Sequence, residues 1–316
     1  MLCAMRAPAD DNTTDPPLVA GVELGGTKSL AVLARGTEIV DRLRVPTTDP
    51  ASTLPTMSEQ LARWRAEIGP FAAIGIGSFG PIGADPARAD HGYVTTTPKP
   101  GWRNADVLGH FAERFDVPIA FDSDVAGAAL AEGRWGASRG CAVHVYLTIG
   151  TGIGGGVVVH GEPVHGLVHP EVGHLRVRRR PDDTFGGSCP FHGDCIEGLA
   201  SGPAIAARAG RAAEELGQEH PVWLDVAAEL AELMTALVLT ISPERIVVGG
   251  GVTGGKPFLL DHVCAHTSTF LADYVAGLDE PAVRALIQAP ELGDDAGPLG
   301  TVALGLRALG ASAARI

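Results

Sequence analysis

A strand, a glycine-rich turn and a second strand occur twice in this chain, and this repeat limits the possible folds more than any other feature. The first copy lies near residues 21–33 and the second near 147–159. In both copies apolar and β-branched residues, which favour strands, flank glycines, which permit tight turns because they carry no Cβ. The second copy runs from an apolar strand over 143–149 through a glycine run into Val157, Val158 and Val159. The sequence therefore predicts one architectural unit used in two domains.

Helices and strands alternate around this repeat, which is typical of α/β proteins. Apolar spacing predicts strands over 71–77, 117–121 and 245–248, a polar loop over 84–103, and helices over 57–68, 124–133, 222–241 and 301–309. Ser201-Gly202-Pro203 predicts one more helix start, with proline in the first turn. We expect a disordered tail over 1–17, an N-terminal α/β domain over 18–135 and a C-terminal α/β domain over 136–316, with the last helix packed back on the N-terminal domain.

Charge and length exclude several classes of protein. The 316 residues carry 24 basic and 37 acidic side chains, and the net charge of −13 argues against general nucleic-acid binding. No apolar run reaches the ~18–20 residues that span a membrane, and residues 1–17 lack the apolar core of a signal peptide. Five cysteines without a disulfide-like framework fit a reducing cytoplasm. Of these, we expect Cys141 and Cys264 to be ordinary small buried residues.

Four residues in one stretch form a candidate metal site. His174 precedes Cys189, His192 and Cys195, which are spaced Cys-x2-His-x2-Cys beside glycine and proline turn formers. Two thiolates and two imidazoles are a full tetrahedral set for zinc, and a full set indicates a structural ion, because a catalytic zinc keeps one position open. The alternative is a group of unrelated surface residues, but three ligands within seven residues argue against it. We expect the basic run over 176–180 to be a solvated strand edge.

Glycine-rich turns at three places predict a phosphate site. They lie at Gly25-Gly26-Thr27-Lys28, at 150–154 and at 249–251. The first is not a Walker A loop, because Thr27 stands where lysine should be and a strand follows instead of a helix. The second matches Gly-x-Gly-x-x-Gly, but it joins two strands, so a dinucleotide fold is not expected. Backbone N–H groups that converge at such turns bind phosphate. Any single turn fits a plain hairpin, whereas three in one α/β chain favour a nucleotide cleft.

In their order and spacing these motifs resemble the ROK family of sugar kinases and sugar-responsive repressors, and most closely its bacterial fructokinases. The resemblance covers residues 20–310 and rests on the segments 23–28, 97–102, 122–125, 147–154, 171–174 and 189–195. It implies the actin-like ATPase, ribonuclease H-like sugar kinase fold, in which two α/β domains flank an ATP and sugar cleft. It also implies ATP and Mg²⁺ as cofactors, a structural Zn²⁺, and a family that is commonly dimeric.

The resemblance assigns roles to individual residues. Asp124 matches the catalytic base, which accepts a proton from a sugar hydroxyl as that hydroxyl attacks the γ-phosphate. The alternative for Asp124 is a plain helix N-cap, and Asp122 is interpreted as a neighbour that orients the site. Glu23 matches a position that holds Mg²⁺ through water. The other residues matched to nucleotide-binding positions are Gly25, Gly26, Thr27, Lys28, Thr148, Gly150, Thr151, Gly152, Pro203, Gly249, Gly250 and Gly251.

The resemblance also places Glu171, His174 and Glu197 around the sugar, where carboxylates accept hydrogen bonds from hydroxyls. Zinc would then fix the loop that carries these residues. Most ROK kinases have three cysteines and one histidine as ligands, so His192 marks a variant that favours fructose as the substrate. Ala126 stands where many members have asparagine, a departure that would shift substrate preference or lower activity.

We therefore expect ATP-dependent phosphorylation of the fructose 6-hydroxyl. The alternatives are glucokinase or another hexose or N-acetylhexosamine kinase, a catalytically silent sugar-binding protein, and a sugar-sensing repressor. ROK repressors carry an N-terminal helix-turn-helix domain, and the seventeen residues before Leu18 are too few for one. Intact Glu23, Asp124 and glycine turns favour catalysis. The predicted partners are a sugar and ATP in a cytoplasmic homodimer, with neither nucleic acid nor membrane.

Overall fold

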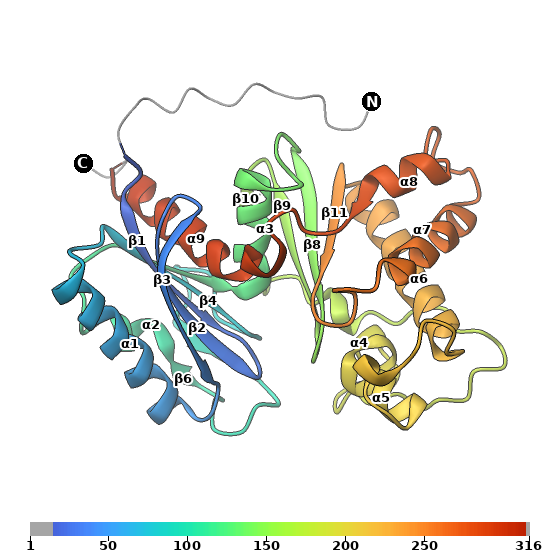
Figure 1. Cartoon of the computed structure of the whole chain (residues 1–316), viewed down its shortest axis with the longest axis horizontal. Coiled ribbons are helices and arrows are strands. Elements are labelled where there is room, and N and C mark those ends of the chain that lie inside the picture. Colours follow the sequence, from blue (N-terminus) through green and yellow to red (C-terminus); the bar gives the residue numbers. More distant parts are fainter. Residues whose placement is uncertain (1–14, 314–316) are drawn as a thin grey trace.

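Two five-stranded sheets dominate the computed structural model, which describes residues 15–313 (Figure 1). The first sheet has the strand order β3-β2-β1-β4-β7, and the second has the order β10-β9-β8-β11-β12. In each sheet the repeated strand–glycine–strand unit forms an antiparallel hairpin beside parallel strands. The prediction of one unit used twice is thus confirmed. The tail predicted over 1–17 lies outside the described residues except for 15–17, which form no helix or strand.

The first sheet is covered on one face by two helices. Its strands are β1 (Leu18–Leu24), β2 (Lys28–Arg35), β3 (Glu38–Pro46), β4 (Ala73–Ser78) and β7 (Ile119–Ser123). Helices α1 (Pro50–Glu67) and α2 (Val107–Ala112) pack on it around the buried side chains of Trp64, Trp102 and Phe111. Helix α1 begins before the predicted residue 57 because the Asp49 carboxylate caps it by accepting a hydrogen bond from the Ser52 N–H. The polar loop predicted over 84–103 contains β5 (Tyr93–Val94), which pairs with β6 (Ala105–Asp106) just beyond the loop.

The second sheet packs against a larger set of helices. Its strands are β8 (Val143–Ile149), β9 (Ile153–Val159), β10 (Glu162–Pro163), β11 (Arg245–Gly249) and β12 (Ile287–Gln288). The helices of this half are α4 (Ile196–Ala200), α5 (Gly202–Ala209), α6 (Val222–Ile241), α7 (Pro257–Leu271) and α8 (Glu280–Leu286). Helix α6 has the bounds that its apolar pattern predicts. Helices α7 and α8 were not predicted, because polar and β-branched residues interrupt their apolar faces.

Two helices lie side by side between the sheets, α3 (Asp124–Trp135) and α9 (Ala296–Ala313) (Figure 1). Helix α9 packs on β1 and β4 of the first sheet, as expected for the last helix, and α3 packs on β8 and β9 of the second. The approach is very close at Gly75, where an added Cβ would lie 1.8 Å from the carbonyl oxygen of Thr301. No helix between residues 15 and 313 is both long and apolar enough to cross a bilayer.

Candidate active site

The glycine turns of both sheets meet at one cleft of about 1040 Å³. Residues of the β1–β2 turn, the β8–β9 turn, the start of α5 and the loop after β11 line this cleft. All residues matched to nucleotide-binding positions are among them except Gly249, which lines a neighbouring cavity. The two hairpin turns are close enough for Thr27 Oγ1 to lie 3.3 Å from Thr151 Oγ1. The fold therefore brings the three glycine turns, which the sequence predicts to bind phosphate, to the same place.

Asp124 lines the same cleft from the first turn of α3. Ser123 caps this helix, because its hydroxyl oxygen accepts a hydrogen bond from the Ala126 N–H at 3.1 Å. The interpretation of Asp124 as a helix N-cap is therefore wrong; its Oδ1 accepts only the neighbouring Val125 N–H, at 2.9 Å. Burial raises the pKa of Asp124 from 3.8 to about 6. A carboxylate with a pKa near neutrality is well suited to accept a proton.

Glu23, the last residue but one of β1, lines the cleft and has an unusual environment. Burial first, and then the charge of Asp124, raise its pKa from 4.5 to about 7, while Lys28 acts in the opposite direction. Its Oε2 atom is buried and has no hydrogen-bond partner within the described part of the chain. Oxygen ligands of this kind, next to a phosphate site, suit Mg²⁺ held directly or through water. The residues present therefore fit the implied magnesium ion.

Asp122 does not belong to the lining of the cleft. Its carboxylate accepts hydrogen bonds from the Ser123 N–H at 2.7 Å and from His165 Nε2 at 3.0 Å, and the pair raises the pKa of His165. His169 lies near the same group, with Nε2 accepting the Ile82 N–H at 3.3 Å and lying 3.6 Å from Glu171 Oε1. The sequence reasoning missed both histidines, although two histidines four residues apart directly before Glu171 were a usable signal.

His174, Cys189, His192 and Cys195 converge as the sequence predicts. Their ligand atoms all lie within 4.8 Å of one another. His174 Nδ1 is 3.8 Å from Cys189 Sγ and 3.6 Å from Cys195 Sγ, and His192 Nδ1 is 3.8 Å from Cys189 Sγ. Tetrahedral zinc with the usual bond lengths requires sulfur–nitrogen separations of about 3.6 Å. The chemistry and spacing of the four side chains thus fit a zinc ion.

Glu171 and Glu197, at the two ends of the segment that carries the candidate zinc ligands, have different surroundings. Burial raises the pKa of Glu171 to about 7, and the charges of Glu197 and Asp124 add to the effect, so the three carboxylates are near neighbours. Glu197 Oε2 accepts a hydrogen bond from the Ile153 N–H at 3.0 Å, at the end of the β8–β9 turn. Gly173 allows the same segment to press on β9, because a Cβ there would lie 1.8 Å from the Ile153 carbonyl oxygen.

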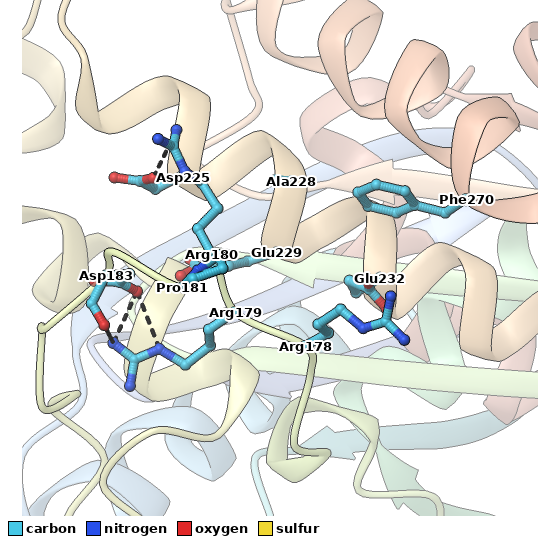
Figure 2. Close-up of a pocket in the computed structure, with 10 residues that line it drawn as sticks. All are labelled: Arg178, Arg179, Arg180, Pro181, Asp183, Asp225, Ala228, Glu229, Glu232 and Phe270. Carbon is cyan, nitrogen blue, oxygen red and sulfur yellow. Dashed lines mark hydrogen bonds and ion pairs between the residues drawn. The ribbon is translucent and has the colours of Figure 1, made fainter.

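The segment between His174 and Cys189 forms no strand, so the prediction of a solvated strand edge over 176–180 is wrong. It crosses α6, and Figure 2 shows Arg179 directed toward Asp183 and Arg180 toward Asp225. Arg179 and Arg180 pair with acidic residues, whereas Arg176 and Arg178 are exposed. Arg179 also reaches Asp194, inside the Cys-x2-His-x2-Cys loop, at 3.5 Å. The basic run thereby contacts the metal loop, which is the loop over Cys189–Cys195.

Two sheets with hairpin phosphate turns around one cleft define the actin-like ATPase sugar kinase fold. The ROK family model matches residues 19–308, and the chain belongs to the ROK family. It is 44% identical over 302 residues to the fructokinase of Zymomonas mobilis, covering 93% of this chain and 98% of the relative. It is 36% identical to the fructokinase of Pediococcus pentosaceus, covering 92% and 99%. The ROK hexokinase of Thermus thermophilus superposes with a TM-score of 0.76 at 26% identity, covering 93% of this chain and 99% of that structure.

Proposed function

We propose that this protein transfers the γ-phosphoryl group of ATP to the 6-hydroxyl of fructose. The 44% identity to the Zymomonas fructokinase, over nearly the full length of both chains, is the observation that carries this proposal. The cleft adds chemical support, because it combines three phosphate turns with buried carboxylates on one side. Glucose is the second candidate acceptor, since a ROK family glucokinase from Streptomyces griseus, solved with glucose, has the same fold.

In the proposed reaction Asp124 is the general base. The 6-hydroxyl oxygen forms a bond to the γ-phosphorus as its proton passes to the Asp124 carboxylate, and the bond from that phosphorus to the β,γ-bridging oxygen breaks to release ADP. The N–H groups of the glycine turns hold the phosphates in line. Glu23 would hold Mg²⁺, which neutralises developing charge on the phosphate oxygens. Glu171, His174 and Glu197 form the proposed sugar wall, braced by zinc on His174, Cys189, His192 and Cys195.

Substituting Asp124→Asn tests the base, with Asp122→Asn as the matched comparison. We expect a fall in kcat of about 10²–10⁴-fold for Asp124→Asn, with ADP binding in calorimetry close to that of the wild type. The assay couples ADP release to a dye and is run with fructose, glucose, mannose and N-acetylmannosamine. Full activity of Asp124→Asn, or loss in Asp122→Asn alone, would remove Asp124 from this role. A preference for any sugar other than fructose would overturn the substrate assignment.

We also propose that the protein is a cytoplasmic homodimer made of two-domain subunits divided near residue 135. The proposed dimer follows from membership of the ROK family, which is commonly dimeric. Cys189, Cys195 and Cys264 form no disulfide, which fits a reducing compartment. Light scattering after size-exclusion chromatography measures the subunit number directly, and a monomeric mass at micromolar concentration contradicts the dimer.

A further inference from the structure

Lysine is scarce in this chain and is placed selectively. Of the 24 basic residues only three are lysines, at positions 28, 99 and 256, and the rest are arginines. Two of the three meet at the first phosphate turn. Lys28 belongs to the turn itself, and Lys99 reaches it from the loop between β5 and β6, where its Nζ donates a hydrogen bond to the Gly26 carbonyl at 2.6 Å. A segment 73 residues further along the chain thus delivers a second ammonium group to the same turn.

Neither ammonium group forms a close ion pair in the described part of the chain, although the charge of Lys28 acts on Glu23. Within residues 15–313, Lys28 and Lys99 take part in no ion pair, although the chain carries a net charge of −13. The ion pairs of this part of the chain that involve arginine are made by Arg42, Arg88, Arg139, Arg179, Arg180, Arg208, Arg284 and Arg307. An ammonium has three donors, and Gly26 accepts only one from Lys99. Positive charge and unused donors therefore remain beside the turn.

The loop that carries Lys99 is held firmly. The Thr97 hydroxyl accepts a hydrogen bond from the Lys99 N–H at 3.2 Å, and prolines on both sides of Lys99 restrict the backbone. Trp102 is buried and donates from Nε1 to the Thr48 carbonyl at 2.6 Å. The ring of Phe79, which lines the cleft, packs edge-on against Trp102 with centroids 5.1 Å apart. The loop that carries Lys99 is thus packed, through Trp102, against Phe79 of the cleft lining.

We propose that Lys99 contacts the phosphoryl group that is transferred, on ATP before the reaction and on the sugar after it. This inference rests on the proposed function. Lys99, like Asp124, comes from the half of the molecule built on the first sheet, whereas Pro203 and the loop after β11 line the cleft from the other half. A nucleotide bound between Pro203 and the loop after β11 would direct its γ-phosphate toward Asp124 and the β1–β2 turn, where Lys99 donates to Gly26. A compact ammonium suits a group that changes bonding partner, because it acts as a point charge without fixed two-pronged geometry.

The test compares nucleotides that differ only in the γ-group. Dissociation constants for ADP and for the non-hydrolysable analogue AMPPNP, both with Mg²⁺, are measured by calorimetry for the wild type, Lys99→Gln and Lys99→Arg. Arg103→Gln is the matched control, because it also removes one positive charge, four residues after Lys99. The Arg103 side chain is exposed and has no polar partner in residues 15–313. We expect Lys99→Gln to weaken AMPPNP by about 10- to 100-fold, the cost of one charge-assisted hydrogen bond, and ADP by less than about twofold. Lys99→Arg should recover part of the loss.

Equal weakening of ADP and AMPPNP would show that Lys99 only positions Gly26, and no change in either constant would remove it from the site. Thermal melts that coincide with the wild type confirm that the variants are folded, and Arg103→Gln should match the wild type for both nucleotides. Because no sugar is present, these constants are independent of the acceptor. Wild-type protein that binds AMPPNP but does not phosphorylate fructose would reject the proposed function and leave the assignment of Lys99 standing.

Discussion

Arg208 is the centre of a buried ion network that we expect to carry much of the stability of the second half of the molecule. Its guanidinium meets both carboxylate oxygens of Glu229, at 2.8 and 3.1 Å, and Asp183 Oδ2 at 3.1 Å. The side chains of all three residues are less than a tenth exposed. Arg208 also lies over the Phe185 ring, 4.9 Å from its centroid. Helix α5, helix α6 and the segment before the metal loop are joined at this point.

Substituting Arg208→Leu removes one side of the network and leaves Glu229 buried without a partner. Asp183 still pairs with Arg179, at 2.8 Å, so most of the loss of stability comes from the unpaired Glu229 carboxylate. Breaking a buried pair in this way costs about 3–5 kcal/mol of unfolding free energy. For a chain of this size each kcal/mol corresponds to about 2 °C, so we expect Tm to fall by about 6–10 °C.

The loss should depend on pH with a definite sign. Burial already raises the pKa of Glu229, and Arg208 is the main group that opposes this rise. Without Arg208 the folded-state pKa rises further above the unfolded value, so the folded variant holds a proton that the unfolded chain releases as pH increases. Relative to the wild type, the variant therefore loses stability from pH 5 to pH 8, and its deficit is smallest at the acid end.

Thermal melts of four proteins at pH 5.5 and pH 8.0 check this reasoning. Arg180→Leu is the control, because Arg180 is 49% exposed and pairs only at the surface, where a pair is worth at most about 1 kcal/mol. Arg208→Leu with Glu229→Leu should recover most of the lost stability, since a buried pair replaced by apolar side chains is often neutral. If Arg208→Leu costs no more than Arg180→Leu, or if the double variant is less stable than the single one, the network does not act as described.

The remaining predictions concern the metal and the cleft carboxylates. Cys195→Ala should lose one equivalent of zinc, measured by mass spectrometry, and should lower Tm, since structural zinc contributes on the order of 10 kcal/mol in small domains. The control Cys264→Ala should keep its metal. Equal zinc content in the two variants would contradict the four-ligand site. Glu23→Gln should abolish turnover yet raise Tm at pH 8, because ionising a carboxyl whose pKa is raised from 4.5 to about 7 destabilises the fold. The gain should vanish below pH 4.5, where the carboxyl is protonated in both states, and a gain that persists there would refute this cause.

Short-range patterns predicted the fold well where a run of residues was uniform. The hairpins at the two glycine turns and the 20-residue helix α6 were predicted because their signals are local and strong. Helix α1 was predicted too short, since its first turn is polar and its start is set by one side chain, Asp49. The strand predicted at the basic run was wrong: the segment pairs with no strand, and its Arg180 instead contacts Asp225 of α6, which is distant in sequence.

The candidate site shows the same limit. The candidate zinc ligands were identified because three of them lie within seven residues, and the candidate phosphate turns because glycine marks them. The local sequence does not indicate the partners of Lys99 and His165: their contacts with Gly26 and Asp122 span 73 and 43 residues. Only the packing of the loops around the first sheet brings these pairs together, and neither periodicity nor spacing contains that information.

Glu197 changes what the metal loop is expected to do. The sequence predicts a sugar-binding carboxylate, yet one of its oxygens already accepts the Ile153 N–H at the second phosphate turn. Cys195 begins the helix that carries Glu197, and Gly173, next to His174, presses on the carbonyl of the same Ile153. Both ends of the segment from Glu171 to Glu197 therefore contact Ile153, the first residue of β9. An ion that fixes this segment would set the position of the phosphate turn together with the sugar wall, so loss of zinc should weaken nucleotide binding as well as sugar binding.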